Sequence, residues 1–398
     1  DEAVARGSSL VITTDCGTKD NQAVVYAKNQ GVDVIITDHH ILGHERPEAI
    51  ALVNPCTIKE NTLFKDIAGS TVSFIFLKTL YEYLDLPFPD FLNEFGLIVS
   101  ALGSLSDRVS LLNPINRLIV KQGIEYFFES QREGIKALRE LSIPSGEMTK
   151  PRHLSRTVIP RLNAPGRIGD PNENIPDSSI VVDLLLLGKG KKNKAKASHV
   201  SRILDAVFNK AADKAKEVAE QRDASQALMA VNDVDSINGR RKQLTAQIED
   251  EMDTLIETQV NPDSDRVILL EGKDWNSGVI GIDADRLKER FLRPAIILNQ
   301  RSDSEYVRGS ARSIPRIDIY KVIDAVEIKF QKEHSRKLFQ AEVISEGKKQ
   351  LVSAFGGHAQ ACGFTLHQND VPVSSGIYFV NLMTDNGRTE TKKIMLMR

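Results

Sequence analysis

SLVITTD at residues 9–15 and VDVIITDHH at residues 32–40 carry the strongest structural signals in this chain. Each is a continuous apolar run rich in β-branched residues, and between them NQAVVYAKNQ at 21–30 has the pattern of a short helix closed by Gly31. Such runs, joined by a helix, are typical of βαβ units whose parallel strands are buried on both faces. A third short run, IALVNP at 50–55, continues the pattern. The sequence therefore predicts an α/β fold built on a buried parallel sheet.

The rest of the chain divides into a helical region, a long connector and a second α/β region. Apolar residues recur at helical spacing through residues 66–147, and residues 198–258 have the pattern of one long, charged, solvent-facing helix. The prolines and glycines of residues 157–176, TVIPRLNAPGRIGDPNENIP, predict a fixed, non-helical loop between them. RVILLEG at 266–272 is strand-like and begins the second α/β region.

The composition excludes several classes of protein. With 398 residues, of which 41% are hydrophobic and 27% charged, the chain is an ordinary globular protein of two to four domains. No stretch reaches the roughly 18 uncharged apolar residues of a membrane helix, which excludes a membrane-spanning protein. Three widely spaced cysteines exclude a disulfide framework and a CxxC zinc site. A net charge of −2 excludes a globally basic nucleic-acid coat, although not a local basic groove.

Aspartates and histidines follow the first two predicted strands. Asp15 comes directly after the first strand, and Asp38, His39 and His40 come directly after the second. Because the carboxyl ends of neighbouring parallel strands open into one crevice, we expect these side chains to converge. Carboxylates with imidazoles suit Mn²⁺, Zn²⁺ or Fe²⁺ better than Ca²⁺. A helix cap explains either aspartate alone, but the pair with two adjacent histidines favours a metal site.

Three further motifs are weaker when each is taken alone. Asp107 ends the helical run ALGSLSD and is equally well explained as a cap or a loop residue. PRLNAPGR carries arginines suited to bidentate phosphate contacts, and an ordinary surface loop is the alternative. GSARS and FGGHAQACGF hold small residues that let main-chain N–H groups approach an anion, although two glycine-rich turns would look the same. The basic run at 189–196 is most simply a solvated loop.

Taken together, these motifs resemble the DHH phosphoesterase family, and in particular its RecJ-like exonucleases. The triplet that names the family is Asp38-His39-His40, and VITTDCG, VDVIITDHH and LVNP are similar to the family's third and fourth motifs in wording and spacing. ALGSLSD and PRLNAPGR resemble the RecJ core, and GSARS and FGGHAQACGF resemble the DHH-associated C-terminal domain. The resemblance covers roughly residues 8–368, with the motifs in the same order.

The resemblance implies a catalytic set and a substrate-binding set. It implies two divalent metal ions, usually Mn²⁺ with Mg²⁺ as the alternative, bridged by Asp15 and held further by His39 and Asp107. His40 would face the scissile phosphate, and Asp38 would orient the histidines from behind. The residues that would hold the nucleic-acid backbone and terminal phosphate are Arg161, Asn163, Arg167, Ser310, Arg312, Gly356, Gly357 and His358.

The resemblance also implies a domain scheme, with departures from the family pattern. We expect a DHH domain at residues 1–187, a connector helix at 188–262 and a smaller α/β DHH-associated C-terminal domain at 263–370. The connector helix would contain an insertion near residues 205–232. Residues 371–398 would be a tail or the start of a further domain. The family's first motif, an HxDxD-like ligand set, and its second motif are usually upstream of Asp1, so we expect the DHH domain to be N-terminally incomplete.

The leading hypothesis is a metal-dependent exonuclease that hydrolyses single-stranded DNA, 5′ to 3′ by family analogy, in DNA repair, recombination or replication. One alternative is a DHH phosphodiesterase for short oligoribonucleotides or cyclic dinucleotides, and another is a non-catalytic replication scaffold related to RecJ. The resemblance implies a cytoplasmic protein with no membrane contact. Its expected partners are single-stranded DNA, a helicase or single-strand-binding protein, and the GINS complex if the source is archaeal.

Overall fold

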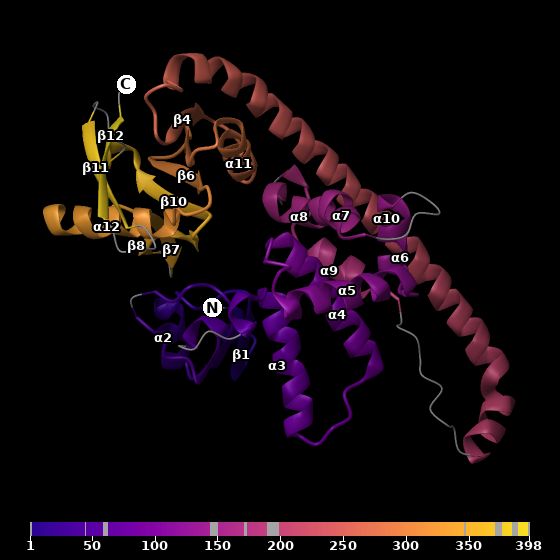
Figure 1. Ribbon diagram of the computed structural model, residues 1–398. Coiled ribbons are helices and arrows are strands. Elements are labelled where there is room, and N and C mark those ends of the chain that lie inside the picture. Colours follow the sequence, from indigo (N-terminus) through magenta and orange to yellow (C-terminus); the bar gives the residue numbers. More distant parts are fainter. Residues whose placement is uncertain are drawn as a thin grey trace. The chain divides into compact units, whose positions relative to one another are not determined.

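The computed structural model describes residues 2–43, 45–58, 63–143, 150–170, 173–188, 199–345, 348–370, 376–383 and 389–396. The chain divides into two compact units, Asp1–Asn238 and Gly239–Arg398, and each is described by itself (Figure 1). The basic run at 189–196, for which we predict a solvated loop, lies outside the described residues.

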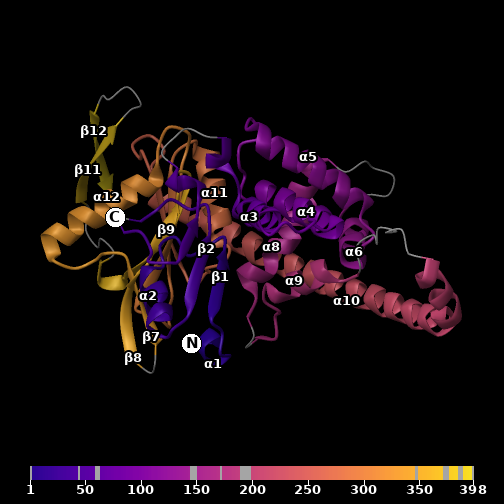
Figure 2. The same cartoon turned by 90° about the horizontal axis from the view of Figure 1, so that it is seen from below.

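The first unit contains a parallel sheet, as the sequence predicts. Its strands β1 (Leu10–Thr14), β2 (Asp33–Thr37) and β3 (Ala51–Val53) follow one another in that order, with all pairs parallel. Helix α2 (Asn21–Asn29) connects the first two strands and buries Val24 against the apolar side chains of β2. Figure 2 shows α2 on one side of these strands and the helices that follow β3 on the other. The carboxyl ends of β1 and β2 are therefore neighbours at one edge of the sheet.

A group of helices packs beside this sheet and confirms the helical pattern of residues 66–147 over its described part. They are α3 (Gly69–Tyr83), α4 (Asp90–Ser106), α5 (Pro114–Glu129) and α6 (Glu133–Ser142). Their core includes these fully buried side chains: Ile98, Phe127, Ile135, Leu138, Leu154, Val158 and Leu184.

The prediction of a non-helical loop over residues 157–176 was wrong for most of its length. Residues Leu154–Val158 form a π-helical turn, η3, which leads directly into helix α8 (Ile159–Ile168). Pro160 stands where η3 passes into α8, and Pro165 is accommodated inside the helix. The buried side chains on one side of α8 pack into the helical core, and this packing outweighs the low helix propensity of two prolines.

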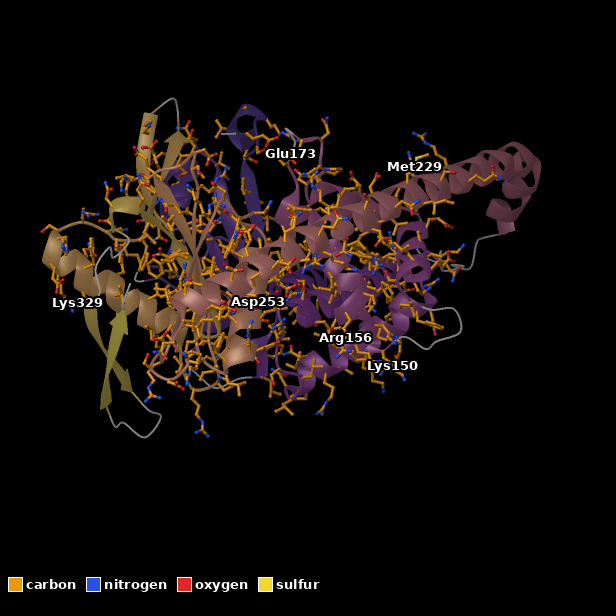
Figure 3. The ribbon with its side chains drawn as sticks, turned by 90° about the horizontal axis from the view of Figure 1, so that it is seen from above. Lys150, Arg156, Glu173, Met229, Asp253 and Lys329 are labelled. Atoms are coloured by element: carbon orange, nitrogen blue, oxygen red, sulfur yellow. The ribbon has the colours of Figure 1, made fainter. Side chains whose placement is uncertain are left out.

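A single long helix, α10 (His199–Gln259), confirms the predicted connector pattern. Within the first unit it packs through Val231 and Val234 against the helical core. Met229 lies on the exposed side of the same helix, with 68% of its surface accessible (Figure 3). In its described part, α10 therefore has one buried side and one side that is exposed to solvent.

The second unit is built on a mixed five-stranded sheet in the order β4-β5-β6-β10-β9. The β4–β5 pair is parallel and the other pairs are antiparallel. Its strands are β4 (Ile268–Lys273), β5 (Ala295–Gln300), β6 (Tyr306–Arg312), β9 (Phe355–His358) and β10 (Ala361–His367). Helices α11 (Ile280–Phe291) and α12 (Ile319–His334) pack on it, which confirms a second, smaller α/β unit.

The remaining elements are short or form separate hairpins. They are α1 (Glu2–Ala5), η1 (Pro55–Thr57), η2 (Leu63–Asp66), α7 (Pro151–His153), α9 (Ser179–Leu186), η5 (Gln368–Asp370) and the paired strands β7 (Gln340–Ser345) with β8 (Lys348–Ser353) and β11 (Gly376–Met383) with β12 (Thr389–Leu396). Over the residues that the structure describes, no helix combines the length and the apolar character needed to cross a bilayer.

Candidate metal centre

Asp15 begins the site at the carboxyl end of β1. Its N–H donates to the carbonyl of Thr37 at 2.9 Å, so the β1–β2 ladder continues one residue past the strand. The main chain of Asp15 is left-handed, with φ of 62°, a conformation that costs a non-glycine residue roughly 1–3 kcal/mol. Aspartate adopts this region more readily than most residues. Such strain is common where a side chain is held for a function, and here 53% of the Asp15 side chain remains exposed.

Gly69, the first residue of α3, makes room for the Asp15 carboxylate. A Cβ atom added at Gly69 would lie 2.1 Å from Asp15 Oδ1, far inside van der Waals contact. The amino end of α3 therefore approaches the carboxylate as closely as only glycine allows.

Asp38 is the buried anchor of the histidine pair. Its side chain is 1% exposed, and its Oδ1 lies 2.7 Å from His40 Nδ1 while accepting from the N–H of His39 at 2.7 Å. Its Oδ2 accepts from the N–H of Thr18 at 3.0 Å. Burial alone would raise the pKa of Asp38, but hydrogen bonds from His40, Thr18 and His39 outweigh it and lower the pKa. Asp38 is therefore a carboxylate that only accepts, so the Nδ1 of His40 is the donor.

His39 lies between two carboxylates. Its Nε2 is 3.1 Å from Asp15 Oδ1 and 3.8 Å from Asp107 Oδ2, and its side chain is only 11% exposed. Burial opposes the charged imidazolium, yet Asp15 and then Asp107 raise the pKa of His39. Burial and the negative charge of Asp15 raise the pKa of Asp107. The negative charge of Asp15 contributes to both shifts, because a nearby carboxylate favours the charged form of His39 and disfavours the charged form of Asp107.

Asp107 reaches the site as the residue that ends α4. Its N–H donates to the carbonyl of Gly103 at 2.9 Å, which closes the last turn of the helix. The neighbouring Ser106 Oγ accepts a hydrogen bond at 3.1 Å from Asn163 Nδ2, on α8. Asn163 therefore acts on the residue beside Asp107, an arrangement that the sequence pattern alone does not reveal.

Two groups of donor atoms result at the carboxyl end of the sheet. The ligand atoms of Asp15, His39 and Asp107 all lie within 4.8 Å of one another, and so do those of Asp15, Asp38 and His40. Two carboxylates and an imidazole, crowded together with an excess of negative charge, are the donors that divalent transition metals prefer. The residues present therefore fit a divalent ion such as Mn²⁺.

The arginines of PRLNAPGR are helical, and their surroundings differ. Arg161 is 16% exposed, and it donates from Nε to Asp235 Oδ1 at 2.7 Å and from Nη1 to the carbonyl of Thr157 at 2.8 Å. Arg167 lies near Arg108, and burial together with this second positive charge lowers the pKa of Arg167. Arg161 is thus engaged by protein groups, whereas Arg167 lies near a second cation, an arrangement that an anion would stabilise.

The candidate substrate residues of the second unit come together on neighbouring strands. Strand β10 separates β6 from β9, and its Ala361 stands opposite Arg312 on one side and His358 on the other. Residues in one cross-strand row share a face of the sheet, and two strand spacings put these main chains about 10 Å apart. Arg312 also donates from Nη1 to Ser310 Oγ at 3.1 Å.

Gly356 and Gly357 belong to the same sheet. Gly356 stands opposite Gly363, which in turn stands opposite Ser310. Gly357 has φ of 146°, so its main chain requires glycine. The two motifs, more than forty residues apart in the sequence, thus lie in three successive rows of a single sheet.

Comparison with known proteins assigns both units. The model of the "DHH family, N-terminal domain" matches residues 2–97, and that of the "DHHA1 domain" matches residues 264–373. The chain belongs to the DHH family. The predicted family membership is therefore confirmed, and the geometry described above lies at this family's name-giving triplet.

Curated relatives of this DHH-family chain carry one name. The chain is 30% identical over 389 residues to the single-stranded-DNA-specific exonuclease RecJ of Bacillus subtilis. The alignment covers 97% of this chain and 39% of that protein. The chain is 28% identical over 382 residues to the RecJ of Escherichia coli, covering 93% of this chain and 55% of that protein. The chain thus spans about two fifths to just over half of the length of these relatives.

Solved structures share the fold of the DHH-family chain. RecJ of Thermus thermophilus in complex with Mn²⁺ matches with a TM-score of 0.65 and 24% identity, covering 93% of this chain and 45% of that one. A manganese-bound exonuclease RecJ matches with a TM-score of 0.59 and 24% identity, covering 92% and 74%. These matches confirm the α/β fold class.

Several residues that shape the site are not among those predicted from the sequence. Gly69 lies against the carboxylate of Asp15, and Ser106 is the neighbour of Asp107. Thr18 hydrogen-bonds to Asp38, and Asn54 hydrogen-bonds to the main chain of His40. Asn54 lies in the IALVNP stretch, and its place directly after a strand is the one signal that marks it. The other three have no pattern of their own, because their roles depend on contacts between distant segments.

Proposed function

We propose that this chain provides the catalytic centre of a divalent-metal-dependent exonuclease that hydrolyses the phosphodiester bonds of single-stranded DNA. The observation that carries the proposal is the convergence of Asp15, His39 and Asp107 on one position beside the Asp38–His40 pair. The names of the relatives, all single-stranded-DNA-specific exonucleases, supply the substrate class. The Mn²⁺ of the related Thermus structure supports the choice of metal.

In this proposal Asp15, His39 and Asp107 would hold two divalent metal ions, with Mn²⁺ preferred and Mg²⁺ accepted. A divalent ion there supplies positive charge to the phosphodiester and lowers the pKa of an attacking water. Asp38 keeps the proton of His40 on Nδ1, which leaves Nε2 as the ring atom available to a phosphate oxygen or a proton in transit.

Substrate contacts fall on residues of both units. Arg167 holds a phosphate in the first unit, and a second group does so in the second unit: Ser310, Arg312, Gly356, Gly357 and His358. Asn163 acts through Ser106 on the loop that carries Asp107. Arg161 acts through its ion pair with Asp235 and so fixes α8.

The domain division at 1–187, 188–262, 263–370 and 371–398 is also part of this proposal. In it the first segment carries the metal centre, α10 forms most of the second, and the third binds substrate. Support comes from the two family matches and from the length of α10. A helicase, a single-strand-binding protein or, in an archaeon, the GINS complex is a proposed partner.

The test follows the degradation of one long single strand, labelled at its 5′ end or its 3′ end, by the full-length protein with Mn²⁺. A 5′-to-3′ exonuclease releases the 5′ label at once as a mononucleotide, while the 3′ label passes through a ladder of shortening products. Cleavage restricted to dinucleotides or cyclic dinucleotides would favour the short-substrate phosphodiesterase. DNA binding with no cleavage in Mn²⁺ or Mg²⁺ would favour the scaffold.

A further inference from the structure

Asn54 lies directly after β3, buried and fully hydrogen-bonded beside the DHH triplet. Its side chain is 4% exposed, and its Oδ1 accepts from the N–H of Cys56 at 2.8 Å, which caps the turn η1. Its Nδ2 donates to the carbonyl oxygen of His40 at 2.9 Å and to Thr18 Oγ1 at 2.9 Å. Three segments, following β1, β2 and β3, are thus joined by one amide group.

The orientation of this amide is fixed by its partners. With the oxygen and nitrogen exchanged, Oδ1 would face the carbonyl oxygen of His40, and Nδ2 would face the N–H of Cys56. Both contacts would then be repulsive, acceptor against acceptor and donor against donor. Both hydrogens of Nδ2 are therefore committed to His40 and Thr18.

Thr18 carries the connection from Asn54 to Asp38. It is 1% exposed, and its N–H donates to Asp38 Oδ2 at 3.0 Å. Its hydroxyl oxygen accepts from Asn54 at 2.9 Å. Asn54 therefore donates to the side chain of Thr18, the main chain of Thr18 donates to Asp38, and Asp38 in turn accepts from the ring of His40.

His40 is consequently held at two points. Its ring is bonded through Nδ1 to Asp38, and its main-chain carbonyl is bonded to Asn54. Two fixed points on one residue determine both the position of its main chain and the direction of its ring. Neither point involves the side chains of Asp15, His39 or Asp107, so this support is separate from the metal-ligand set.

We propose that Asn54 is a positioning residue of the site, which acts through Thr18 and the main chain of His40 to aim the His40 ring at the reacting phosphate. The inference rests on the proposed function, because it assigns His40 a role in hydrolysis. Partners that orient functional side chains in metal sites typically contribute about 10–100-fold in activity or metal affinity. Because Asn54 touches no metal-ligand side chain, its contribution falls on turnover.

The principal variant is Asn54→Ser, which retains a capping oxygen for η1 but is too short to reach both His40 and Thr18. Thr18→Val removes the hydroxyl that accepts from Asn54 and keeps the N–H that donates to Asp38, and Thr18→Ser restores the hydroxyl. Thr57→Ala is the matched control, because among the described residues the hydroxyl of Thr57 donates only to the carbonyl of Asn54, in the same turn. The unfolding temperature of each variant shows whether it folds.

Two measurements on the full-length protein decide the matter. In Mn²⁺-dependent hydrolysis of single-stranded DNA, we expect Asn54→Ser and Thr18→Val to lower kcat by roughly 10–100-fold. KM and Mn²⁺ affinity should stay near the wild-type values, and Thr18→Ser should recover most of kcat. In ¹⁵N spectra of labelled histidines, with His40 assigned by its loss in His40→Gln, the Nδ1-protonated pattern of wild-type His40 should broaden or shift in both variants.

A lower unfolding temperature with kcat and His40 spectra equal to those of Thr57→Ala would overturn the proposal, because Asn54 would then serve only the fold. If the wild-type protein hydrolyses no DNA, the proposed function fails. The histidine spectra still decide on Asn54 in that case, since unchanged His40 signals in Asn54→Ser would refute the positioning role.

Discussion

At the scale of single residues, the site depends on a close approach between Asp15 and Gly69. Asp15 is held in a left-handed conformation at the end of β1, and no side chain larger than hydrogen fits beside its carboxylate at Gly69. A carboxylate whose main chain is fixed and whose position is confined has little freedom to reorganise. This restriction predicts a large effect from a small substitution outside the ligand set.

Gly69→Ala should displace the Asp15 carboxylate and lower Mn²⁺ affinity by about 10-fold or more, as for other supports of metal ligands. Isothermal titration of Mn²⁺ into the folded variant measures this effect. Gly239→Ala is the matched control, because a Cβ atom there meets nothing within 4 Å and alanine favours the helix. Equal Mn²⁺ affinities for the two variants would show that Gly69 does not constrain Asp15.

Residues of this kind also mark the limit of prediction from the sequence. The Asp-His-His triplet could be found because three chemically suited residues stand together after a recognisable strand. Thr18 and Asn54 could not, because their bond joins positions 36 residues apart and exists only once three loops have folded together. Polar residues that form such tertiary hydrogen bonds show no periodic pattern and no unusual composition in the sequence, so they cannot be identified from it.

At the scale of elements, the prolines of α8 led to a wrong prediction, because residues 157–168 are helical and not a loop. Local propensity disfavours a helix there, but the apolar side of α8 packs into the helical core, and the ion pair of Arg161 with Asp235 on α10 adds to this packing. The buried β-strands were predicted correctly for the opposite reason, since there propensity and burial agree.

Arg161→Met should therefore destabilise the first unit and leave DNA contacts intact. Loss of a partly buried charged hydrogen bond costs about 1–3 kcal/mol, which would appear as a lower unfolding temperature. The slope of log affinity for single-stranded DNA against log salt should not change. Arg312→Met is the matched comparison, and it should reduce that slope by about 0.7, the contribution of one phosphate contact. A reduced slope for Arg161→Met would show that Arg161 contacts the backbone instead.

The packing of α11 against α10 in the second unit contains a buried acid. Asp283 on α11 is fully buried, neither of its oxygens has a hydrogen-bond partner among the described residues, and its ion pair with Arg286 is long, at 3.5 Å. Burial raises the pKa of Asp283 to about 7, with Arg286 and Arg241 opposing the rise and Glu249 adding to it. Arg286 also pairs with Glu249 on α10, and Arg290 pairs with Asp253, which Figure 3 labels on that helix.

Asp283 should make the second unit less stable as pH rises. An aspartate in the unfolded chain has a pKa near 3.9, so between about pH 4 and 7 the folded state retains a proton that the unfolded state has lost. Its contribution to stability is therefore greatest below pH 4 and is lost as pH rises through 7. Asp283→Asn should raise the unfolding temperature at pH 8 more than at pH 5. Exposed Asp263→Asn is the control, and an equal gain at both pH values would contradict the raised pKa.

At the scale of the whole molecule, two units with separate cores carry the two sets of candidate residues. The candidate metal centre belongs to the first unit and the Arg312–His358 row to the second. The order of the motifs along the chain was enough to predict family membership. The contacts within each set became visible only in the fold, because they join residues that are up to 92 positions apart, from Asp15 to Asp107.

The most direct test of the metal centre is the binding of Mn²⁺ to the full-length protein, measured by isothermal titration for the wild type, Asp15→Asn, Asp107→Asn and Asp33→Asn. Asp33 is the control because it is exposed at the opposite end of β2 from the triplet, so its substitution removes a charge without touching the site. We predict that Asp15→Asn and Asp107→Asn each lower Mn²⁺ affinity by more than about 100-fold, which exceeds the loss of about 10–100-fold that is typical when a partner only orients a ligand, while Asp33→Asn matches the wild type. Wild-type affinity in Asp15→Asn and Asp107→Asn would contradict the assignment of this cluster as the metal centre.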